Sequence, residues 1–212
     1  MNEKDIVRHG YNRVAAAYLD KRMFHSAGSE LLTRLLDQLP ANARILDAGC
    51  GAGIPVTAHL AERSLVTGVD FSVEQLRLAK GLVESAEFVC QDLSELGFAE
   101  NTFDAICSYY AIIHIPRSLH AQVFAEFHKL LVPGGLALLC LGAKDLEEDF
   151  EGNYFGTQMY WSHYDEAANR RMLRKAGFEE LWSELVPDTA FGVNNGGKSN
   201  QNTGLESPPN MA

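Results

Sequence analysis

The feature that most constrains the fold is the alternation of short apolar segments with amphipathic segments along most of the chain. The apolar segments have the length and composition of buried strands, and the segments between them place apolar residues at helical spacing. Strands that alternate with helices predict an α/β fold with a doubly wound, mostly parallel sheet and helices on both faces. The expected strands are residues 45–46, 65–69, 88–90, 103–108 and 136–141, with a sixth at 178–186.

Helix-start and helix-stop signals support this division. Helices are predicted over about 4–20, 31–39, 55–63 and 117–131, the second of them stopped by Pro40. The segment Ser72-Val73-Glu74-Gln75 fits a capping box, in which Ser72 caps a helix and the Gln75 side chain reaches back to the Ser72 N–H.

Composition narrows the function. The chain has 212 residues, 46% of them hydrophobic, which suits one globular domain. A formal net charge of −10 disfavours binding to nucleic acid, whose affinity comes largely from Lys and Arg. We find neither an apolar run long enough for a membrane helix nor a secretory signal, and the four cysteines lack metal-ligand spacing. We therefore expect a cytoplasmic protein without a metal site that binds neither nucleic acid nor membrane; its oligomeric state is left open.

Polar residues and glycines follow several of the predicted strands. The first strand leads into Asp47 and a glycine loop at 49–53, the second ends at Asp70, the third leads into Asp92, and the fourth ends at Ser108. Ligands of doubly wound sheets bind outside the carboxyl ends of the strands, where the strand order reverses. The sequence therefore predicts that these residues converge on one binding site.

The residue types at this edge favour a nucleoside-containing cofactor. Glycine lets the backbone turn sharply and lets a ligand approach closely. Asp70 lies 17 residues after Gly53, where a carboxylate can accept hydrogen bonds from both hydroxyls of a ribose. Ile54 stands where the dinucleotide pattern G-x-G-x-x-G requires its last glycine. Asp47 suits an ammonium group rather than a phosphate, which favours S-adenosylmethionine over a nicotinamide dinucleotide.

These motifs resemble those of the class I S-adenosylmethionine-dependent methyltransferases of the small-molecule type. The resemblance covers about residues 5–186 and includes six segments in the family's order, and it implies a Rossmann-like fold and S-adenosylmethionine as the cofactor. The segments are 45–53, 69–72, 88–93, 103–106, 113–116 and 131–135, with residues 11–15 and 18–20 similar to the family's N-terminal cap helix.

The resemblance also implies a role for each matching position. The loop glycines would line the methionine part and the ribose, Asp70 would hold the ribose hydroxyls, and Asp92 would bind the adenine amino group. The backbone of the fourth strand's end would receive the ammonium, and Tyr18 would close over the cofactor. The full expected cofactor set is Tyr18, Asp47, Gly49, Gly51, Gly53, Asp70, Phe71, Asp92, Leu93, Ser108 and Tyr109.

Candidates for the acceptor side are His114, Tyr160 and His163. His114 follows the fourth strand and could act as a base, although a packed structural residue is an equal reading. Tyr160 and His163 belong to an aromatic stretch that could stack on a substrate or could pack a lid onto the body. Residues 144–164 are expected to form a substrate-covering insertion, and residues 1–40 a helical cap.

The C-terminus departs from the family pattern. Residues 1–186 are expected to form the methyltransferase domain, but a seventh strand is doubtful, and residues 187–212 are polar enough for a flexible tail. This would leave a sheet edge exposed. The predicted function is methyl transfer from S-adenosylmethionine to an unidentified small-molecule acceptor; the alternative is a non-catalytic S-adenosylmethionine-binding or interaction module.

Overall fold

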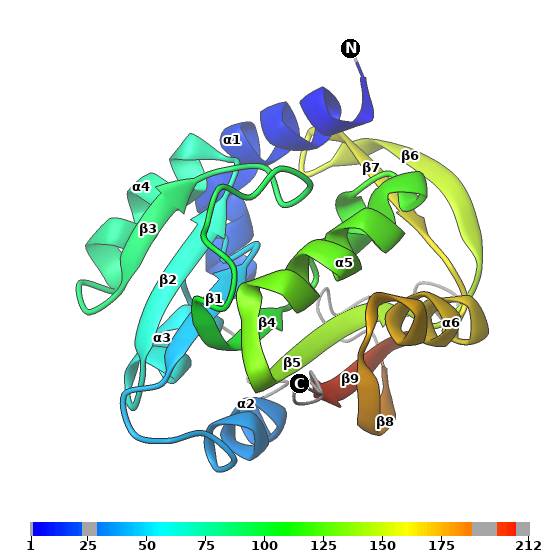
Figure 1. Cartoon of the computed structure of the whole chain (residues 1–212). Helices are drawn as coiled ribbons and strands as arrows, with labels where there is room; N and C mark the ends of the chain where they lie inside the picture. Colours follow the sequence, from blue (N-terminus) through cyan, green and yellow to red (C-terminus); the bar gives the residue numbers. More distant parts are fainter. Residues whose placement is uncertain (1, 23–28, 188–198, 207–212) are drawn as a thin grey trace.

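The computed structural model describes residues 2–22, 29–187 and 199–206. The central sheet contains strands β1 (Arg44–Ala48), β2 (Leu65–Asp70), β3 (Glu87–Cys90), β4 (Phe103–Ser108), β5 (Leu131–Gly142), β8 (Glu179–Pro187) and β9 (Ser199–Glu206). Their order is β3-β2-β1-β4-β5-β9-β8 (Figure 1). The first five strands are parallel, and β9 is antiparallel to both of its neighbours. The strand order reverses between β1 and β4, so the predicted switch point is confirmed.

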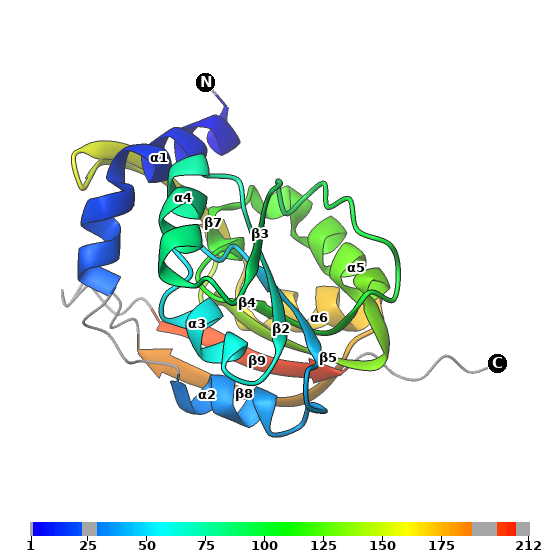
Figure 2. The same ribbon diagram turned by 90° about the vertical axis from the view of Figure 1, so that its left-hand side faces the viewer.

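Six α-helices lie in the described part of the chain: α1 (Glu3–Arg22), α2 (Ser29–Leu36), α3 (Val56–Ala61), α4 (Val73–Leu82), α5 (His120–Leu130) and α6 (Glu166–Ala176). Two 3₁₀ turns, η1 (Ile112–His114) and η2 (Arg117–Leu119), connect β4 to α5. Figure 2 shows α2, α3 and α4 on one side of the sheet and α5 and α6 on the other, as the doubly wound fold requires. None of the described helices combines the length and the apolar character needed to cross a bilayer.

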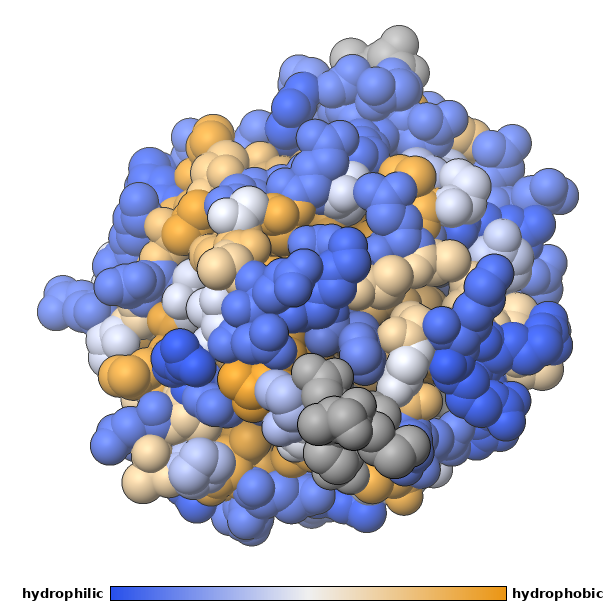
Figure 3. Space-filling model, in the orientation of Figure 1, coloured by the Kyte–Doolittle hydropathy of each residue, from blue (hydrophilic) through white to orange (hydrophobic). Residues whose placement is uncertain are grey.

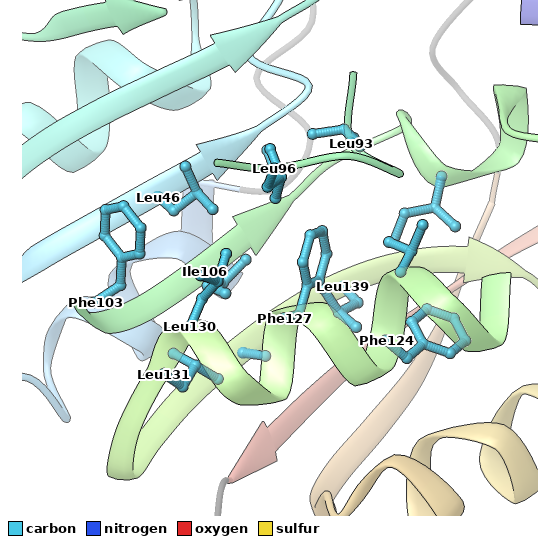
Figure 4. Packing of buried hydrophobic residues seen from close by; sticks show 14 of the residues in the cluster. Leu46, Leu93, Leu96, Phe103, Ile106, Phe124, Phe127, Leu130, Leu131 and Leu139 are labelled. Carbon is cyan, nitrogen blue, oxygen red and sulfur yellow. The ribbon is translucent and has the colours of Figure 1, made fainter. Parts of the chain in front are cut away.

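Consecutive strand residues supply the two faces of the core. Leu46, Ile106 and Leu139 face α5, where they pack with the fully buried Phe124 and Phe127 (Figure 4). Side chains of successive strand residues point to opposite faces of a sheet. Burying each of these large side chains stabilises the fold by roughly 1.5–3 kcal/mol.

The opposite face uses the neighbouring positions of the same strands. Ile45, Ala105 and Leu138 pack with Leu32 of α2 and Leu60 of α3. Hydrophilic side chains cover the outward faces of α5 and α6 (Figure 3). The strand residues that point to either face of the sheet are thus apolar, because helices cover both faces.

The seventh strand, which the sequence made doubtful, is present as β9. β9 pairs with β5 from Leu136 to Gly142 and with β8 over most of its length. It therefore covers the edge of β5 that the sequence led us to expect exposed. Part of the expected tail, residues 199–206, belongs to the sheet, whereas 188–198 and 207–212 lie outside the described residues.

The expected insertion at 144–164 is a separate two-stranded hairpin of β6 (Leu146–Tyr154) and β7 (Thr157–His163). The hairpin lies beside α1 (Figure 1), and the two share an apolar cluster that includes Val7, Tyr18 and Met159. Together they form a roof beyond the carboxyl ends of the parallel strands.

The strand β5 begins earlier than predicted, at Leu131 rather than Leu136. The segment 133–135 is an irregular part of the strand, and the pairing with β4 shifts register between Phe103 and Ala105. Proline removes a ladder donor, which accounts for the irregularity.

Candidate functional site

A cavity lies at the carboxyl ends of β1, β2 and β4, beneath α1. It encloses about 860 Å³, the open solvent at its mouth included. Its lining residues come from α1, the glycine loop, the ends of β2 and β3, the first turn of α4, and the segment after β4. They are Lys4, Val7, Tyr11, Tyr18, Leu19, Gly49, Cys50, Gly51, Ala52, Ile54, Asp70, Phe71, Gln75, Gln91, Asp92, Leu93, Tyr109, Tyr110, Ala111, His114 and Ile115.

The glycine loop opens the floor of this cavity. Gly49 has a φ of +86°, and a Cβ placed on it would lie 2.1 Å from the Cβ of Ala111. Gly51 also has a positive φ, and its N–H donates to Asp70 Oδ2 at 3.0 Å. The loop therefore needs glycine at 49 for space and turns its backbone at 51 toward the end of β2. Gly53 packs against α4 and is not among the described lining residues.

Asp70 is held at the end of β2 by backbone donors. The N–H groups of Gly51 and Ser72 donate to its two carboxylate oxygens, at 3.0 and 2.8 Å. Burial raises the pKa of Asp70 to about 6, against the opposing effect of the N–H groups of Ser72, Gly51 and Phe71. The carboxylate is thus fixed in orientation, and hydrogen-bond donors from a ligand would favour its charged form further.

Asp92 is the second carboxylate of the cavity and follows β3. Lys4 of α1 lies 2.8 Å from its Oδ2, and the N–H and hydroxyl of Ser94 donate to its Oδ1. Burial alone would raise the pKa of Asp92, but the hydrogen bonds from Lys4 and Ser94 outweigh it and lower that pKa. Lys4 thereby connects the cap helix to the edge of the site.

Two of the expected cofactor residues support the loop from behind rather than lining the cavity. Asp47 is buried and its Oδ2 accepts the hydroxyl of Thr57 on α3. Ser108 donates its hydroxyl to the carbonyl of Ala48 at 2.8 Å. Neither belongs to the described lining, so their contacts are those of residues that order the loop and the ends of β1 and β4.

His114 is a buried residue of the cavity lining and lies between α1 and the hairpin. Its Nδ1 lies 2.8 Å from the carbonyl of Tyr160, and its Nε2 lies 2.8 Å from the hydroxyl of Tyr11. Because a carbonyl only accepts, Nδ1 carries the proton and Nε2 accepts the Tyr11 O–H. Burial lowers the pKa of His114 to about 4, with the Tyr160 carbonyl opposing, so the ring is neutral near pH 7.

The other two acceptor-side candidates lie outside the described lining of the cavity. Tyr160 is buried in the cluster between α1 and the hairpin, and its carbonyl positions His114. His163 lies at the end of β7, where its Nδ1 is 2.6 Å from the carbonyl of Lys144. The structure thus brings His114 into the site and places the other two around it.

Sequence reasoning missed several lining residues, among them Lys4, Tyr11 and Gln75. A signal was present for two of them: Lys4, Tyr11 and Tyr18 recur at seven-residue steps, which places them on one face of α1. Gln75 gave no such signal, because its position suggested a capping role.

Known proteins resemble this chain in sequence and in fold. A family model described as a methyltransferase domain matches residues 45–135. Phosphoethanolamine N-methyltransferase 3 of Arabidopsis thaliana is 36% identical over 159 residues, which is 71% of this chain and 31% of that protein. The chain belongs to the class I S-adenosylmethionine-dependent methyltransferases. Its cofactor is S-adenosylmethionine, as the sequence predicts.

Other similar proteins of this kind differ in the chemistry that their names state. The 24-methylenesterol C-methyltransferase 3 of Arabidopsis thaliana is 36% identical over 100 residues, which is 44% of this chain and 27% of that protein. The solved structure of the [4+2]-cyclase SpnF superimposes with a TM-score of 0.73 at 19% identity, covering 95% of this chain and 96% of that one. The chain spans less than a third of the length of both plant methyltransferases. The comparisons therefore identify the family and the fold but do not identify the acceptor.

The residues of the cavity suit S-adenosylmethionine. Asp70 would offer a carboxylate to the ribose hydroxyls, and Asp92 would offer one to the adenine amino group. Gly49 and Gly51 let the ligand approach the backbone, and the neighbouring Tyr18 supplies an aromatic wall from the cap helix. Both carboxylates face one cavity, which is what a single nucleoside requires.

Proposed function

We propose that this methyltransferase moves a methyl group from S-adenosylmethionine to a small-molecule acceptor that enters beneath α1 and the β6–β7 hairpin. The observation that carries the proposal is the contact between Gly51 and Asp70 at the wall of a cavity that extends to His114. It supports a nucleoside at one end of the cavity and a reacting group at the other. A cytoplasmic location stays part of this proposal.

The cofactor supplies an activated methyl group, so the chain's main task is to align the acceptor atom behind it. Holding two reactants in reacting geometry lowers a barrier by roughly 7–11 kcal/mol. Tyr11 and Tyr18, whose rings lie edge to face 5.3 Å apart, would form the wall against which the acceptor rests. Roofing by α1 would exclude water from the same space.

Tyr11 and His114 would together remove a proton from the acceptor. His114 is neutral and its Nε2 is the acceptor of the Tyr11 hydroxyl. As the acceptor atom bonds to the methyl group, Tyr11 would take its proton and pass its own to Nε2. Tyr160 would keep the ring oriented through its carbonyl, and His163 would support the hairpin. Proton transfer by positioned groups of this kind contributes roughly 10²–10⁴-fold to rate.

The charge of the lining favours an acceptor without a phosphate. Of the Lys and Arg residues in the described chain, Lys4 alone lines the cavity, and it is paired with Asp92. Recognition of a phosphate relies on Arg and Lys side chains. We therefore infer that the acceptor is uncharged or an amine, even though one relative is named for phosphoethanolamine.

The non-catalytic alternative drew its support from an incomplete sheet. Because β9 completes the sheet beside β5, the sheet gives no support to a non-catalytic function. Calorimetry with the cofactor and a methyl-transfer assay still separate the two functions, since a binding module would take up S-adenosylmethionine without any transfer.

The test is transfer of a labelled methyl group from S-adenosylmethionine to a panel of phenols, enols, amines and matched phosphorylated compounds. We expect product with an unphosphorylated member, and about a hundredfold slower transfer for Tyr11→Phe with unchanged affinity for S-adenosylhomocysteine. Cofactor binding without transfer to any member would contradict the proposed activity. Product only with phosphorylated members would contradict the acceptor class.

A further inference from the structure

Gln75 is a buried polar residue at the cavity whose side chain has no role in the architecture described so far. It lies in the first turn of α4, is 1% exposed and belongs to the cavity lining. Among the described residues, neither its amide nitrogen nor its amide oxygen has a hydrogen-bond partner. A buried polar group left unpaired destabilises a fold, so this side chain calls for a partner that a ligand could supply.

The expected capping role of Gln75 is taken over by another residue. The Ser72 hydroxyl accepts from the Gln75 backbone N–H at 3.3 Å, as a capping box requires. The reciprocal bond is not formed, because the Ser72 N–H donates to Asp70 Oδ1. The prediction that the Gln75 side chain reaches back to Ser72 was therefore wrong, and its amide is left for the cavity.

The amide and the Asp70 carboxylate flank the same residue of the glycine loop. Gln75 Oε1 lies 3.7 Å from the position that a Cβ on Gly51 would take, and the Gly51 N–H donates to Asp70 Oδ2. The carboxylate only accepts hydrogen bonds, whereas the amide can also donate them. The pair is thus complementary to a hydroxyl group, which donates one hydrogen bond and accepts others.

We propose that Gln75 is a cofactor-binding residue whose Nε2–H donates to a ribose hydroxyl that donates its own hydrogen to Asp70. This inference rests on the proposed function, because it assigns the ribose of S-adenosylmethionine to this end of the cavity. In the cofactor-free protein the amide is unsatisfied, and in the complex it is paired. Gln75 thereby lowers the stability of the free protein and raises its affinity for the cofactor.

The test compares Gln75→Leu with the parent protein in two measurements. A leucine of similar size removes the unpaired amide, so we expect the melting temperature of the cofactor-free protein to stay equal or rise. The Kd for S-adenosylhomocysteine should rise about fivefold or more, the loss of one hydrogen bond. The parent protein should bind the 2′-deoxy or the 3′-deoxy analogue more weakly. Gln75→Leu should lose less affinity with that analogue than the parent does, because only the hydrogen bond from the hydroxyl to Asp70 is left to lose.

Gln91→Leu is the matched control. Gln91 also lines the cavity, but its Oε1 accepts the Gly97 N–H at 2.9 Å. Its replacement should lower the melting temperature and leave the discrimination against the deoxy analogue intact.

Two results would overturn the assignment of Gln75. The first is a Kd of Gln75→Leu for S-adenosylhomocysteine within twofold of the parent value. The second is weaker binding by Gln75→Leu together with a lower melting temperature and full discrimination against both deoxy analogues, which would mark Gln75 as a structural residue. Failure of the parent protein to bind S-adenosylhomocysteine would instead overturn the proposed function itself, so the two failures are distinguishable.

Discussion

Asp70 is the residue on which cofactor affinity should depend most. Two ribose hydroxyls donating to its carboxylate contribute roughly 1.5–3 kcal/mol each, and part of this is lost as unpaired hydroxyls regain water. We expect Asp70→Ala to weaken binding of S-adenosylhomocysteine by about 3 kcal/mol, or about a hundredfold, in calorimetry. Asp104→Ala is the control, since Asp104 caps the Arg44 N–H near the amino end of β4. An unchanged Kd for S-adenosylhomocysteine in Asp70→Ala would contradict the assignment of the ribose to this site.

The ionisation of Asp70 gives the binding a characteristic pH dependence. Burial raises the pKa of Asp70 to about 6, and only the ionised carboxylate accepts from both hydroxyls. Affinity for S-adenosylhomocysteine should therefore be constant above pH 7 and fall up to about tenfold per unit below pH 6. The measurement is a Kd series from pH 8 to pH 5. The same series with Asp70→Asn should be nearly flat; an equal slope in both proteins would assign the effect to another group.

The sequence located these charged residues because each follows a strand at a fixed place in the fold. It could not show what each side chain does there. Asp47 has the residue type expected of a ligand, yet its carboxylate is taken by Thr57. Gln75 matched a capping pattern, yet Asp70 occupies the donor it was expected to bind. Which of several nearby groups forms a given hydrogen bond depends on the three-dimensional structure, and sequence spacing alone does not show it.

At the scale of elements, the strands that the sequence did not predict form because they pair with neighbouring strands, and their residue types alone do not favour a strand. The strand β9 contains polar residues and a glycine, which disfavour strands on their own. It is a strand because β5 and β8 present hydrogen-bonding edges on both sides. The hairpin was predicted as an insertion but not as two strands for the same reason, since β6 has four acidic residues and is mostly exposed.

The contact between α1 and the hairpin should set the geometry of the roof. A Cβ on Gly10 would lie 2.9 Å from Cε of Met159 and 3.0 Å from the carbonyl of Gln158, so the helix and β7 are in close contact there. Gly10→Val should push α1 away and raise the Kd for S-adenosylhomocysteine by about tenfold while the central sheet stays folded. Circular dichroism and calorimetry check this.

Gly81→Val provides the comparison for Gly10→Val, because it also changes a helical glycine but meets nothing within 4 Å. Both variants change the helix-forming preference by a similar small amount, because valine is a somewhat better helix former than glycine. Equal affinities in the two would show that the close packing of α1 has no bearing on the site.

At the scale of the whole molecule, buried titratable groups predict the response to acid. Burial lowers the pKa values of His114 and His120 to about 4, below the ordinary value of about 6.5. Between these pH values the folded protein binds fewer protons at both rings than the unfolded chain does, so acidification destabilises it. Asp70 acts in the opposite direction because its pKa is raised. The two histidines outweigh it, and the net loss is on the order of 4 kcal/mol from pH 7 to pH 4.

The cofactor should make this loss steeper. S-adenosylhomocysteine stabilises the folded protein by mass action, and its affinity itself falls below pH 6 as Asp70 is protonated. Urea unfolding at pH 7, 6 and 5, with and without the ligand, should therefore give two curves that converge on acidification. His120→Gln removes a histidine ring that is not part of the cavity lining. It should flatten both curves without changing the pH at which they converge. Ligand protection that persists undiminished at pH 5 would contradict the placement of a titrating Asp70 at the ribose.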